Sequence, residues 1–281
     1  MRLSLVICTR NRADRLPECL AALDALSSKG NFQLVLVDNG STDSTRTVLD
    51  AYEADFEIET VSEPTPGLAR ARNAGWRASS GEVVVFTDDD CYVEPEFVEH
   101  IVQLFAQHPE IGFFGGRVLL HNPLDYPITI KEDLAEEYFP PFRFIEAGKI
   151  HGANFGFRRE VLEKLGGFDN RLGAGTPFPC EDIEMVGRAV ASGWAGMYSP
   201  IPTVRHDHGR RTATEVSMLI QGYDIGGGAY YISMLKQKTI RRQTVRHFIS
   251  RSMALTPRKC FRRLKRTMRQ LTGAMRFLLS T

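Results

Sequence analysis

The stretch Gly81-Glu82-Val83-Val84-Val85-Phe86-Thr87-Asp88-Asp89-Asp90-Cys91 decides the fold. Its four apolar residues, three of them β-branched, follow a glycine and predict a strand buried on both faces. Three consecutive carboxylates stand directly at the end of that strand. Because an open parallel sheet binds ligands outside the carboxyl ends of its strands, we expect the chemistry of the protein here.

The three adjacent aspartates repel one another, and a strand end is a costly place for them unless a cation is present. Carboxylate oxygens suit Mg²⁺ or Mn²⁺, which proteins usually share with the phosphates of a substrate. The alternative is an acidic turn with solvated carboxylates. The stretch alone does not decide between the two, so the rest of the chain has to.

Strand and helix alternate every ten to fifteen residues, which is typical of a parallel α/β sheet. The expected strands are 3–8, 34–37, 56–61, 83–86, 111–118, 152–157 and one or two within 197–204. The expected helices are 16–26 capped by Asp14, one from Ser41, Thr42 or Asp43 to 52, then 68–79, 95–107, 159–165 and 181–192. Residues 121–150 lack a clear period and predict a loop or subdomain outside the sheet.

The amino-acid composition limits the classes of protein to which this chain can belong. The 281 residues, 43% of them hydrophobic and 25% charged, allow one sizeable core with a smaller appendage. Five scattered cysteines without a Cys-x-x-Cys pair indicate a reducing compartment and argue against disulfides or zinc. The apolar run 3–8 is too short for a signal peptide, and no run of about 18 apolar residues predicts a membrane span. We therefore expect a cytoplasmic protein.

The net charge of +1 conceals a strong asymmetry. Residues 236–281 contain 14 Lys and Arg and no Asp or Glu, which leaves 21 basic and 34 acidic residues, a net charge of −13, in the first 235. A helix is expected over 214–236, interrupted at Gly226-Gly227-Gly228. An acidic body therefore carries a basic tail.

The tail has an apolar stripe at helical spacing. The stripe comprises Phe261, Leu264, Met268, Leu271, Met275 and Leu278, with Arg and Lys on the remaining faces. Such a helix suits an anionic membrane surface, where each cation contributes roughly 1 kcal/mol. The alternatives are packing on its own domain or on a second subunit, and nucleic acid, for which no recognition module is present. We expect the membrane surface and no nucleic acid, and the oligomeric state stays open.

Two further strands end in polar residues. The first is followed by Thr9-Arg10-Asn11-Arg12 and the second by Asp38-Asn39-Gly40. A carboxylate at Asp38 can accept from a base or a ribose, and Arg12 with nearby N–H groups suits phosphate. The alternative is that Asp38-Asn39-Gly40 only forms a turn with a helix cap.

Seven segments stand in the order and spacing of one known family. They are Ser4-Leu5-Val6-Ile7-Cys8-Thr9-Arg10-Asn11-Arg12, Val37-Asp38-Asn39-Gly40-Ser41-Thr42-Asp43, Gly67-Leu68-Ala69-Arg70-Ala71-Arg72-Asn73-Ala74-Gly75, Thr87-Asp88-Asp89-Asp90, Gly152-Ala153-Asn154, Gly166-Gly167-Phe168-Asp169 and Glu181-Asp182. With these segments the chain resembles family 2 of the inverting glycosyltransferases, from about residue 2 to residue 212. The resemblance implies the GT-A fold, a Rossmann-like, mostly parallel α/β sheet flanked by helices.

The resemblance also implies a donor site. Thr9, Arg12 and Asp38 would line the nucleotide, with Asp38 on the base, and Arg72 and Asn73 would lie near it. Asp88 and Asp90 match the outer acids of the family's Asp-x-Asp motif: the first faces the ribose or sugar, and the last binds the Mn²⁺ or Mg²⁺ that bridges the diphosphate. Because all three positions are Asp, either Asp89 or Asp90 can be the principal metal ligand, with Asp90 preferred and Asp89 assigned to the donor.

Asp182 matches the catalytic base of the family. An inverting transfer needs a base that deprotonates the acceptor hydroxyl opposite the leaving diphosphate. Glu181 would orient or bind the acceptor, and Asn154 would face the sugar or acceptor. The alternative is that Glu181 and Asp182 only place negative charge at a helix N-terminus.

The segment His206-Asp207-His208-Gly209-Arg210-Arg211 resembles a metal-completing segment found in part of the family. His206 is preferred as metal ligand over His208, and Arg210 and Arg211 would close over the diphosphate. The alternative is a pair of surface histidines beside a basic loop.

These observations predict a metal-dependent inverting glycosyltransferase that moves a sugar from a nucleotide-diphosphate donor, with UDP favoured, to a saccharide or lipid-linked acceptor in cell-surface polysaccharide or glycoconjugate synthesis. The expected domains are a GT-A domain over 1–212, with a nucleotide-binding half 1–118 and an acceptor-binding half 119–212, and a helical basic tail over 213–281 that associates with the inner face of the cell membrane. The alternatives are a non-catalytic sugar-nucleotide-binding module and, less favoured, a sugar nucleotidyltransferase, for which the glycines of a phosphate loop are missing after the first strand.

Overall fold

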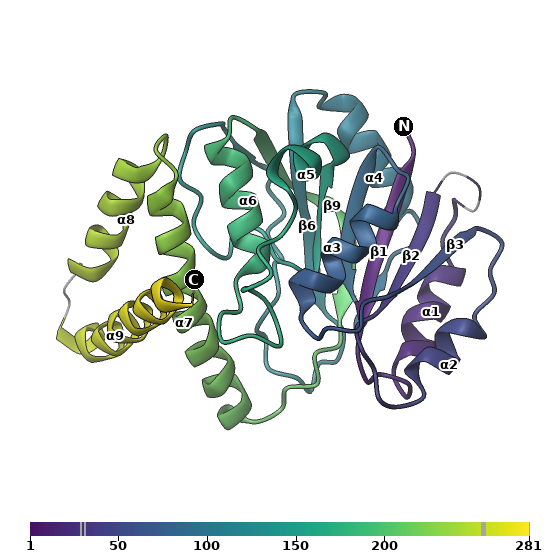
Figure 1. The fold of residues 1–281 in the computed structure, drawn as a ribbon, viewed down its shortest axis with the longest axis horizontal. Helices are drawn as coiled ribbons and strands as arrows, with labels where there is room; N and C mark the ends of the chain where they lie inside the picture. Colours follow the sequence, from purple (N-terminus) through teal and green to yellow (C-terminus); the bar gives the residue numbers. More distant parts are fainter. Residues whose placement is uncertain (29, 31, 254–256, 281) are drawn as a thin grey trace.

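A computed structural model describes the backbone of residues 1–28, 30, 32–253 and 257–280, and the side chains of these residues outside 252–262. A central sheet is flanked by helices, with β1, β2 and β3 at one end of the molecule and the helices α7, α8 and α9 at the other (Figure 1). This α/β architecture is the one that the alternating sequence pattern predicts.

The sheet is parallel on the side of β1 and mixed on the other side. Its strands are β1 (Leu3–Thr9), β2 (Phe32–Asp38), β3 (Glu57–Ser62), β4 (Val83–Asp88), β5 (Cys91–Val93), β6 (Ile111–Leu120), β7 (Glu137–Phe139), β8 (Asn154–Arg158) and β9 (Ala195–His206). Their order is β3-β2-β1-β4-β8-β6-β9-β5, and β7 pairs with β9. The strand β8 runs antiparallel to β4 and β6, whereas β1 is parallel to both β2 and β4.

Helices cover both faces of the sheet. They are α1 (Leu16–Asp24), α2 (Thr45–Asp50), α3 (Leu68–Ala78), α4 (Phe97–Gln107), α5 (Arg159–Leu165), α6 (Glu181–Ala191), α7 (Ala213–Lys236), α8 (Arg241–Met253) and α9 (Pro257–Leu279). Because β1 residues alternate between the two faces, Leu5 and Ile7 pack with α1, α2 and α4, and Val6 packs with α3, α5 and α6. This double cover explains the uninterrupted apolar runs in the central strands.

The register of the parallel strands brings their polar ends together. Thr9 of β1 is paired with Asp38 of β2, and Cys8 is paired with Asp88 of β4. The three strands therefore end at the same level, and the residues that follow them share one edge of the sheet, where the sequence places the candidate site.

Two short strands were not predicted. The strand β5 follows directly on the acidic turn and pairs with β9, and β7 lies within 121–150, which was expected to contribute nothing to the sheet. Both have only three residues, which is too few for a hydrophobic period to show. The predicted cap of α1 is also wrong, because Arg15 is the N-cap residue and no side chain caps it.

The glycines Gly226, Gly227 and Gly228 do not interrupt α7, which is continuous over its 24 residues. They make room for neighbouring backbone instead: a Cβ on Gly228 would lie 2.0 Å from the carbonyl oxygen of Gln270, and one on Gly273 would lie 2.0 Å from that of Ile225. The glycines therefore allow α7 and α9 to cross at close range.

The apolar stripe of α9 faces away from α7. Gln270, Gly273 and Phe277 are buried against the protein, whereas the stripe residues Leu264, Met268, Leu271, Met275 and Leu278 are exposed. Phe261 lies outside the described side chains. Among residues 1–28, 30, 32–253 and 257–280, no helix is both long and apolar enough to cross a membrane.

Candidate active site

A cleft of about 1220 Å³ opens at the carboxyl ends of β1 and β4 and continues past α6 to the C-terminal helices. Most of the site residues expected from the sequence line it. These are Thr9, Arg12, Arg72, Asp88, Asp89, Asp90, Glu181, Asp182, His206 and Arg210. Segments separated by up to two hundred residues in the chain thus meet around one cavity.

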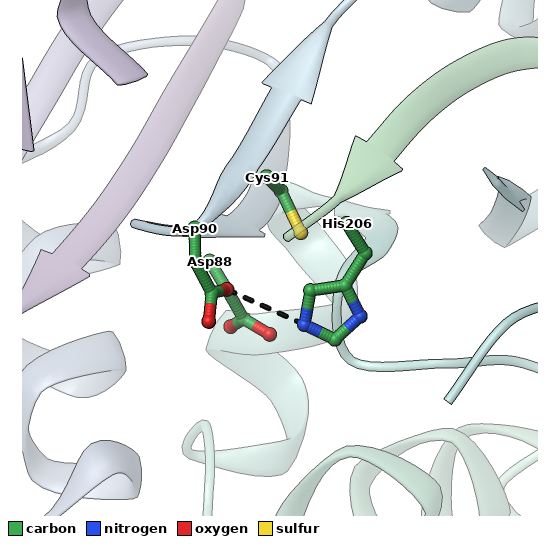
Figure 2. Close-up of side chains that lie close together, drawn as sticks. All are labelled: Asp88, Asp90, Cys91 and His206. Carbon is green, nitrogen blue, oxygen red and sulfur yellow. Dashed lines mark ion pairs between the residues drawn. The ribbon is translucent and has the colours of Figure 1, made fainter. Parts of the chain in front are cut away.

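One end of the cleft holds a candidate metal centre. Asp88, Asp90, Cys91 and His206 each offer a ligand atom, and these atoms lie within 4.8 Å of one another (Figure 2). The centre is assembled by the antiparallel pairing of β5 with β9, which sets Cys91 opposite His206. The short strand β5 therefore places the histidine beside the acidic turn.

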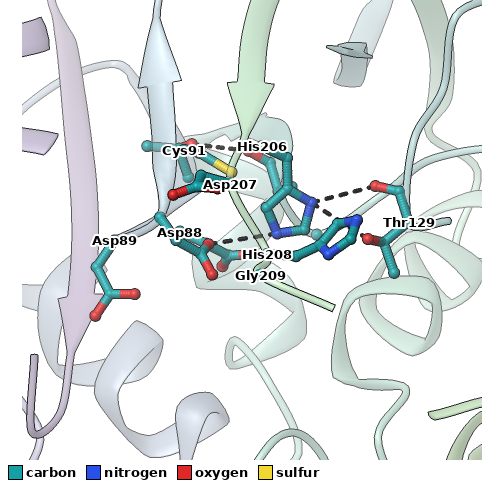
Figure 3. A network of polar contacts seen from close by, with 12 residues as sticks. Asp88, Asp89, Cys91, Thr129, His206, Asp207, His208 and Gly209 are labelled. Carbon is teal, nitrogen blue, oxygen red and sulfur yellow. Dashed lines mark hydrogen bonds and ion pairs between the residues drawn. The ribbon is translucent and has the colours of Figure 1, made fainter. Parts of the chain in front are cut away.

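The hydrogen bonds distinguish His206 from His208. Nδ1 of His206 lies 3.3 Å from the carbonyl oxygen of Thr129 (Figure 3), which can only accept, so this nitrogen donates. Nε2 of His206 faces Asp90 at 3.4 Å (Figure 2). In His208, Nε2 donates to the carbonyl of Tyr126 and Nδ1 accepts from the backbone of Arg210. His208 therefore has no ring nitrogen left for a metal, whereas His206 has one aimed at the carboxylates.

The three aspartates point in different directions. Asp89 is turned toward β1, away from the other acids in Figure 3, and accepts from the hydroxyl of Thr9 at 2.6 Å. Asp90 lies beside His206, and Asp88 beside Arg72 at 3.0 Å. The geometry thus groups Asp88 and Asp90 with the histidine and leaves Asp89 to orient Thr9.

The donor set fits a hard divalent ion. Burial raises the pKa of the Cys91 thiol well above its ordinary value, so this neutral sulfur is a poor ligand. Of the remaining donors, the two carboxylates are oxygen ligands that suit Mn²⁺ or Mg²⁺, and the imidazole is a ligand typical of transition metals. Burial also raises the pKa of Asp88, and that of Asp89 to about 6, and the neighbouring carboxylate of Asp90 adds to both shifts.

Arg72 links this end of the cleft to α6. Its buried guanidinium contacts Glu181 at 2.7 Å, Asp88 at 3.0 Å and the carbonyl oxygen of Gly152 at 3.0 Å. Burial raises the pKa of Glu181 to about 7, and Arg72 acts against that shift. The planar guanidinium donates to three acceptors at the same time, one in β4, one at the start of α6 and one in the segment before β8. The ammonium group of a lysine would be less well suited to this arrangement.

Asp182 lies next to this network. One oxygen of its half-buried carboxylate accepts from the backbone N–H of Gly152 at 2.8 Å, and the other accepts from that of Ile183. The carbonyl oxygen of Gly152 in turn accepts a hydrogen bond from the guanidinium of Arg72, which also donates to the carboxylate of Asp88. The chain of contacts from Asp182 through Gly152 and Arg72 to Asp88 holds this carboxylate in the same cleft as the metal centre.

Four expected site residues are not brought to the cleft. The carboxylate of Asp38 accepts a hydrogen bond from the backbone N–H of Ser41, and the side-chain amide of Asn73 donates one to the carbonyl oxygen of Phe168. The side-chain amide of Asn154 donates hydrogen bonds to the carbonyl oxygens of Arg117 in β6 and Pro202 in β9. Arg211 is paired with Asp125 at 2.9 Å. None of the four lines the cavity, and their hydrogen bonds and ion pair hold loops and strands together. Their assignments to nucleotide, acceptor or diphosphate therefore stay predictions.

Several residues that line the cleft were not expected from the sequence. Asn39 lies at its edge, and its amide group bonds the carbonyls of Glu63 and Thr65 and the N–H of Gly67, which fixes the start of α3. Residues of α7, α8 and α9 line the far end, among them Tyr223, Tyr230, Tyr231, Arg251, Lys265, Arg266 and Arg269. The only sequence signal for them is the positive charge of the tail.

Curated relatives share the sequence pattern. The sequence model of the family described as "Glycosyl transferase family 2" matches residues 4–166. The chain is 24% identical over 184 residues to a glucosyl-dolichyl phosphate glucuronosyltransferase of Haloferax volcanii, covering 62% of this chain and 58% of that protein. It is 25% identical over 246 residues to glycosyltransferase AglE of the same organism, covering 85% of this chain and 76% of the relative.

Solved structures share the fold. The structure of Staphylococcus aureus TarS 1–349 in complex with UDP-GlcNAc matches with a TM-score of 0.68 at 16% identity, covering 99% of this chain and 81% of the other. The mannosyltransferase PcManGT from Pyrobaculum calidifontis, in complex with GDP-Man and Mn²⁺, matches with a TM-score of 0.62 at 17% identity, covering 100% and 88%. The fold is GT-A, and the family match over more than half of the residues shows that this chain belongs to glycosyl transferase family 2.

Proposed function

We propose that the protein transfers a sugar, with inversion, from a nucleotide-diphosphate sugar to a hydroxyl group of a saccharide or lipid-linked acceptor, with UDP as the favoured nucleotide. One observation carries the proposal: a carboxylate at the start of α6 and a donor set for a divalent ion lie in the same cleft and are joined through Arg72. Inversion is typical of the family.

The donor occupies the end of the cleft at β1 and β4. Two arginines, Arg12 and Arg210, supply positive charge for phosphate oxygens. The guanidinium of Arg12 lies 3.7 Å from the carboxylates of both Asp89 and Asp90. Asp88, Asp90 and His206 would hold Mn²⁺ or Mg²⁺, an ion whose chemistry is to neutralise charge on a leaving diphosphate. Among the relatives by fold, TarS has been crystallised with UDP-GlcNAc, and the structure of PcManGT is a complex with GDP-Man and Mn²⁺.

Asp182 acts as the general base. The acceptor oxygen attacks the anomeric carbon, its proton passes to the carboxylate of Asp182, and the bond from that carbon to the diphosphate breaks, with the electron pair leaving on the nucleoside diphosphate. The N–H of Gly152 fixes the carboxylate without consuming its remaining lone pairs. Attack from the side opposite the leaving group gives inversion.

Binding and turnover can be tested separately. In a thermal-shift panel of UDP-, GDP- and dTDP-sugars, one nucleotide should raise the melting temperature, and the gain should need Mn²⁺. Asp90→Ala should abolish the gain, whereas Asp182→Asn should keep it and lose sugar transfer. Asp50→Asn, an exposed position of α2, is the matched control. Normal transfer by the Asp182→Asn variant would refute the base assignment.

We also propose that 213–281 acts as a membrane-surface module appended to a GT-A domain over 1–212, whose halves 1–118 and 119–212 serve donor and acceptor. The exposed apolar stripe of α9 stands beside basic residues, including Arg266, Arg269 and Arg276. A surface that is apolar in the middle and cationic at its side matches an anionic bilayer. The inner face of the cell membrane, where acidic lipids are common, is the favoured location.

Vesicle sedimentation tests this attachment. The protein should bind vesicles that contain phosphatidylglycerol, bind pure phosphatidylcholine weakly, and detach as salt rises. The double variant Met268→Gln and Met275→Gln should lose binding, whereas Ile201→Gln, an exposed apolar residue of β9, should not. Equal binding by the methionine double variant and the wild type would exclude the stripe as the attachment surface.

A further inference from the structure

The cleft is larger than a donor site requires. Its volume is about 1220 Å³, whereas pockets for a single small ligand are typically about 300–1000 Å³. The metal centre and Arg12 occupy the end at β1 and β4, and the cavity continues between α6 and the C-terminal helices. Space for a second substrate therefore lies on the side of α7, α8 and α9.

The far end of this cavity is cationic. We call it the basic lobe: it is lined by Arg251, Lys265, Arg266 and Arg269, with two carboxylates, Asp224 and Glu146, among them. Asp224 already contacts Arg266 at 3.6 Å and Arg269 at 3.2 Å, and Glu146 contacts His247 at 3.3 Å. Among the side chains that the structure describes, four cations thus face two carboxylates that are themselves paired, so the lobe retains positive charge. The positive charge of the lobe also affects a neighbouring histidine. Burial lowers the pKa of His247, and the positive charges of Arg251 and Arg266 lower it further.

Aromatic rings lie beside these cations. Phe144 stacks on Tyr231 with 6.1 Å between ring centroids, and it contacts Tyr230 at 5.8 Å and His247 at 4.8 Å. All four rings line the cleft. Ring faces of this kind pack on the apolar faces of sugars or on hydrocarbon chains, while the adjacent guanidinium groups suit phosphate oxygens.

We propose that the basic lobe binds a phosphate or diphosphate group carried by the acceptor, so that the acceptor reaches from this lobe to Asp182. The proposal rests on the proposed function, because it names the chemistry of the second substrate. It follows from the size of the cleft, the excess of cations at its far end and the position of Asp182 within the same cavity. The phosphate can belong to a lipid-linked sugar or to a phosphate-containing polymer, since both present the same group.

The test is a binding titration with two phosphate probes. Protein saturated with Mn²⁺ and the stabilising nucleotide is titrated with farnesyl diphosphate and, separately, with a soluble glycerol phosphate oligomer. Farnesol and glycerol serve as the uncharged counterparts. At least one phosphate probe should bind, and its uncharged counterpart should not. Preference for the prenyl compound assigns a lipid-linked acceptor, and preference for the oligomer assigns a polymer.

Variants locate the binding in the basic lobe. The double variant Arg251→Gln and Arg266→Gln should weaken binding of the phosphate probe at least tenfold, and Lys265→Gln is the second variant. Arg246→Gln, an exposed cation of α8 that does not line the cleft, should bind as the wild type does. The nucleotide-dependent thermal shift must persist in each variant, which shows that it is folded.

Two results would overturn the proposal: neither phosphate probe binds, or the double variant and Lys265→Gln both bind as tightly as the wild type. Either result would leave the donor site intact if the nucleotide shift is present. Conversely, if no nucleotide raises the melting temperature of the wild type, the proposed function is refuted. The titration with phosphate probes would then be repeated without nucleotide. Binding that depends on Arg251 and Arg266 would still support a phosphate site in the basic lobe.

Discussion

The guanidinium of Arg72 joins segments that lie far apart in the chain. It is buried and contacts Glu181, Asp88 and the carbonyl oxygen of Gly152, so the candidate metal centre and the start of α6 share one cation. A buried ion pair is costly to break, because the remaining charge is left without a partner. We therefore regard Arg72 as the residue that sets the distance between the metal centre and Asp182.

His206 should matter for metal binding, and His208 should not. His206→Gln is expected to weaken Mn²⁺ binding strongly, because it removes the nitrogen that faces Asp90. In His208→Gln the metal affinity should stay within a few-fold of the wild type, since both nitrogens of this ring are used by the backbone. Calorimetric titration with Mn²⁺ measures both. A larger loss in the His208 variant would reverse the assignment.

The free energy of unfolding should depend on pH because of the carboxyl group of Asp89. Burial raises its pKa to about 6 in the folded protein, so the folded state holds a proton that the unfolded state has released. The stabilisation is present at about pH 4 and is lost as the pH rises through 6. Without metal, the free energy of unfolding of the wild type relative to Asp89→Asn should fall by up to about 3 kcal/mol between about pH 4 and pH 7. Urea unfolding at several pH values checks this, and a difference that grows with pH would contradict it.

At the scale of elements, the crossing of α7 and α9 depends on glycine. Gly228→Ala should lower the free energy of unfolding by about 1–3 kcal/mol, because the new methyl group would meet the backbone of Gln270 and Ala274. Gly222→Ala in the same helix meets only the Pro179 side chain at 3.6 Å and should stabilise the protein by up to about 1 kcal/mol. Chemical denaturation of both variants provides the comparison, and equal effects would exclude a tight crossing.

At the scale of the whole molecule, the C-terminal helices share a core with the α/β part. Phe277 of α9 is buried, with its ring 5.4 Å from that of Phe178, in a cluster that also contains Leu172 and Tyr230. The helical segment is thus packed on the domain that carries the site, and the far wall of the cleft belongs to the same folded unit.

Neighbouring residues of α9 allow a matched test of that core. Phe277→Ala should destabilise the whole protein by about 3–5 kcal/mol and keep a single unfolding transition, because its cavity would open between the two parts. Leu278→Ala, at an exposed position, should change stability little. Calorimetry would show a separate early transition of the tail if the helices were independent.

The first four strands followed from the sequence because their signals are local. Apolar runs such as 83–86, helical spacing and turn residues each act within a few positions, so β1 to β4 and the acidic edge were predicted. The three-residue strands β5 and β7 carry no such period. The contacts of Asn73, Asn154 and Arg211 depend on which distant groups lie within reach, namely the carbonyl oxygens of Phe168 and Arg117 and the carboxylate of Asp125.

The amino-acid sequence by itself determined the α/β fold, the common edge of the first strands and the set of acids that stand there, because hydrophobic period and the alternation of strand and helix are encoded locally. Only the tertiary structure decided that His206 joins Asp88 and Asp90, that Asp89 turns to Thr9, and that cations of the tail line the far end of the cleft. Those outcomes depend on contacts between segments up to two hundred residues apart, and such contacts are fixed by packing of the whole chain.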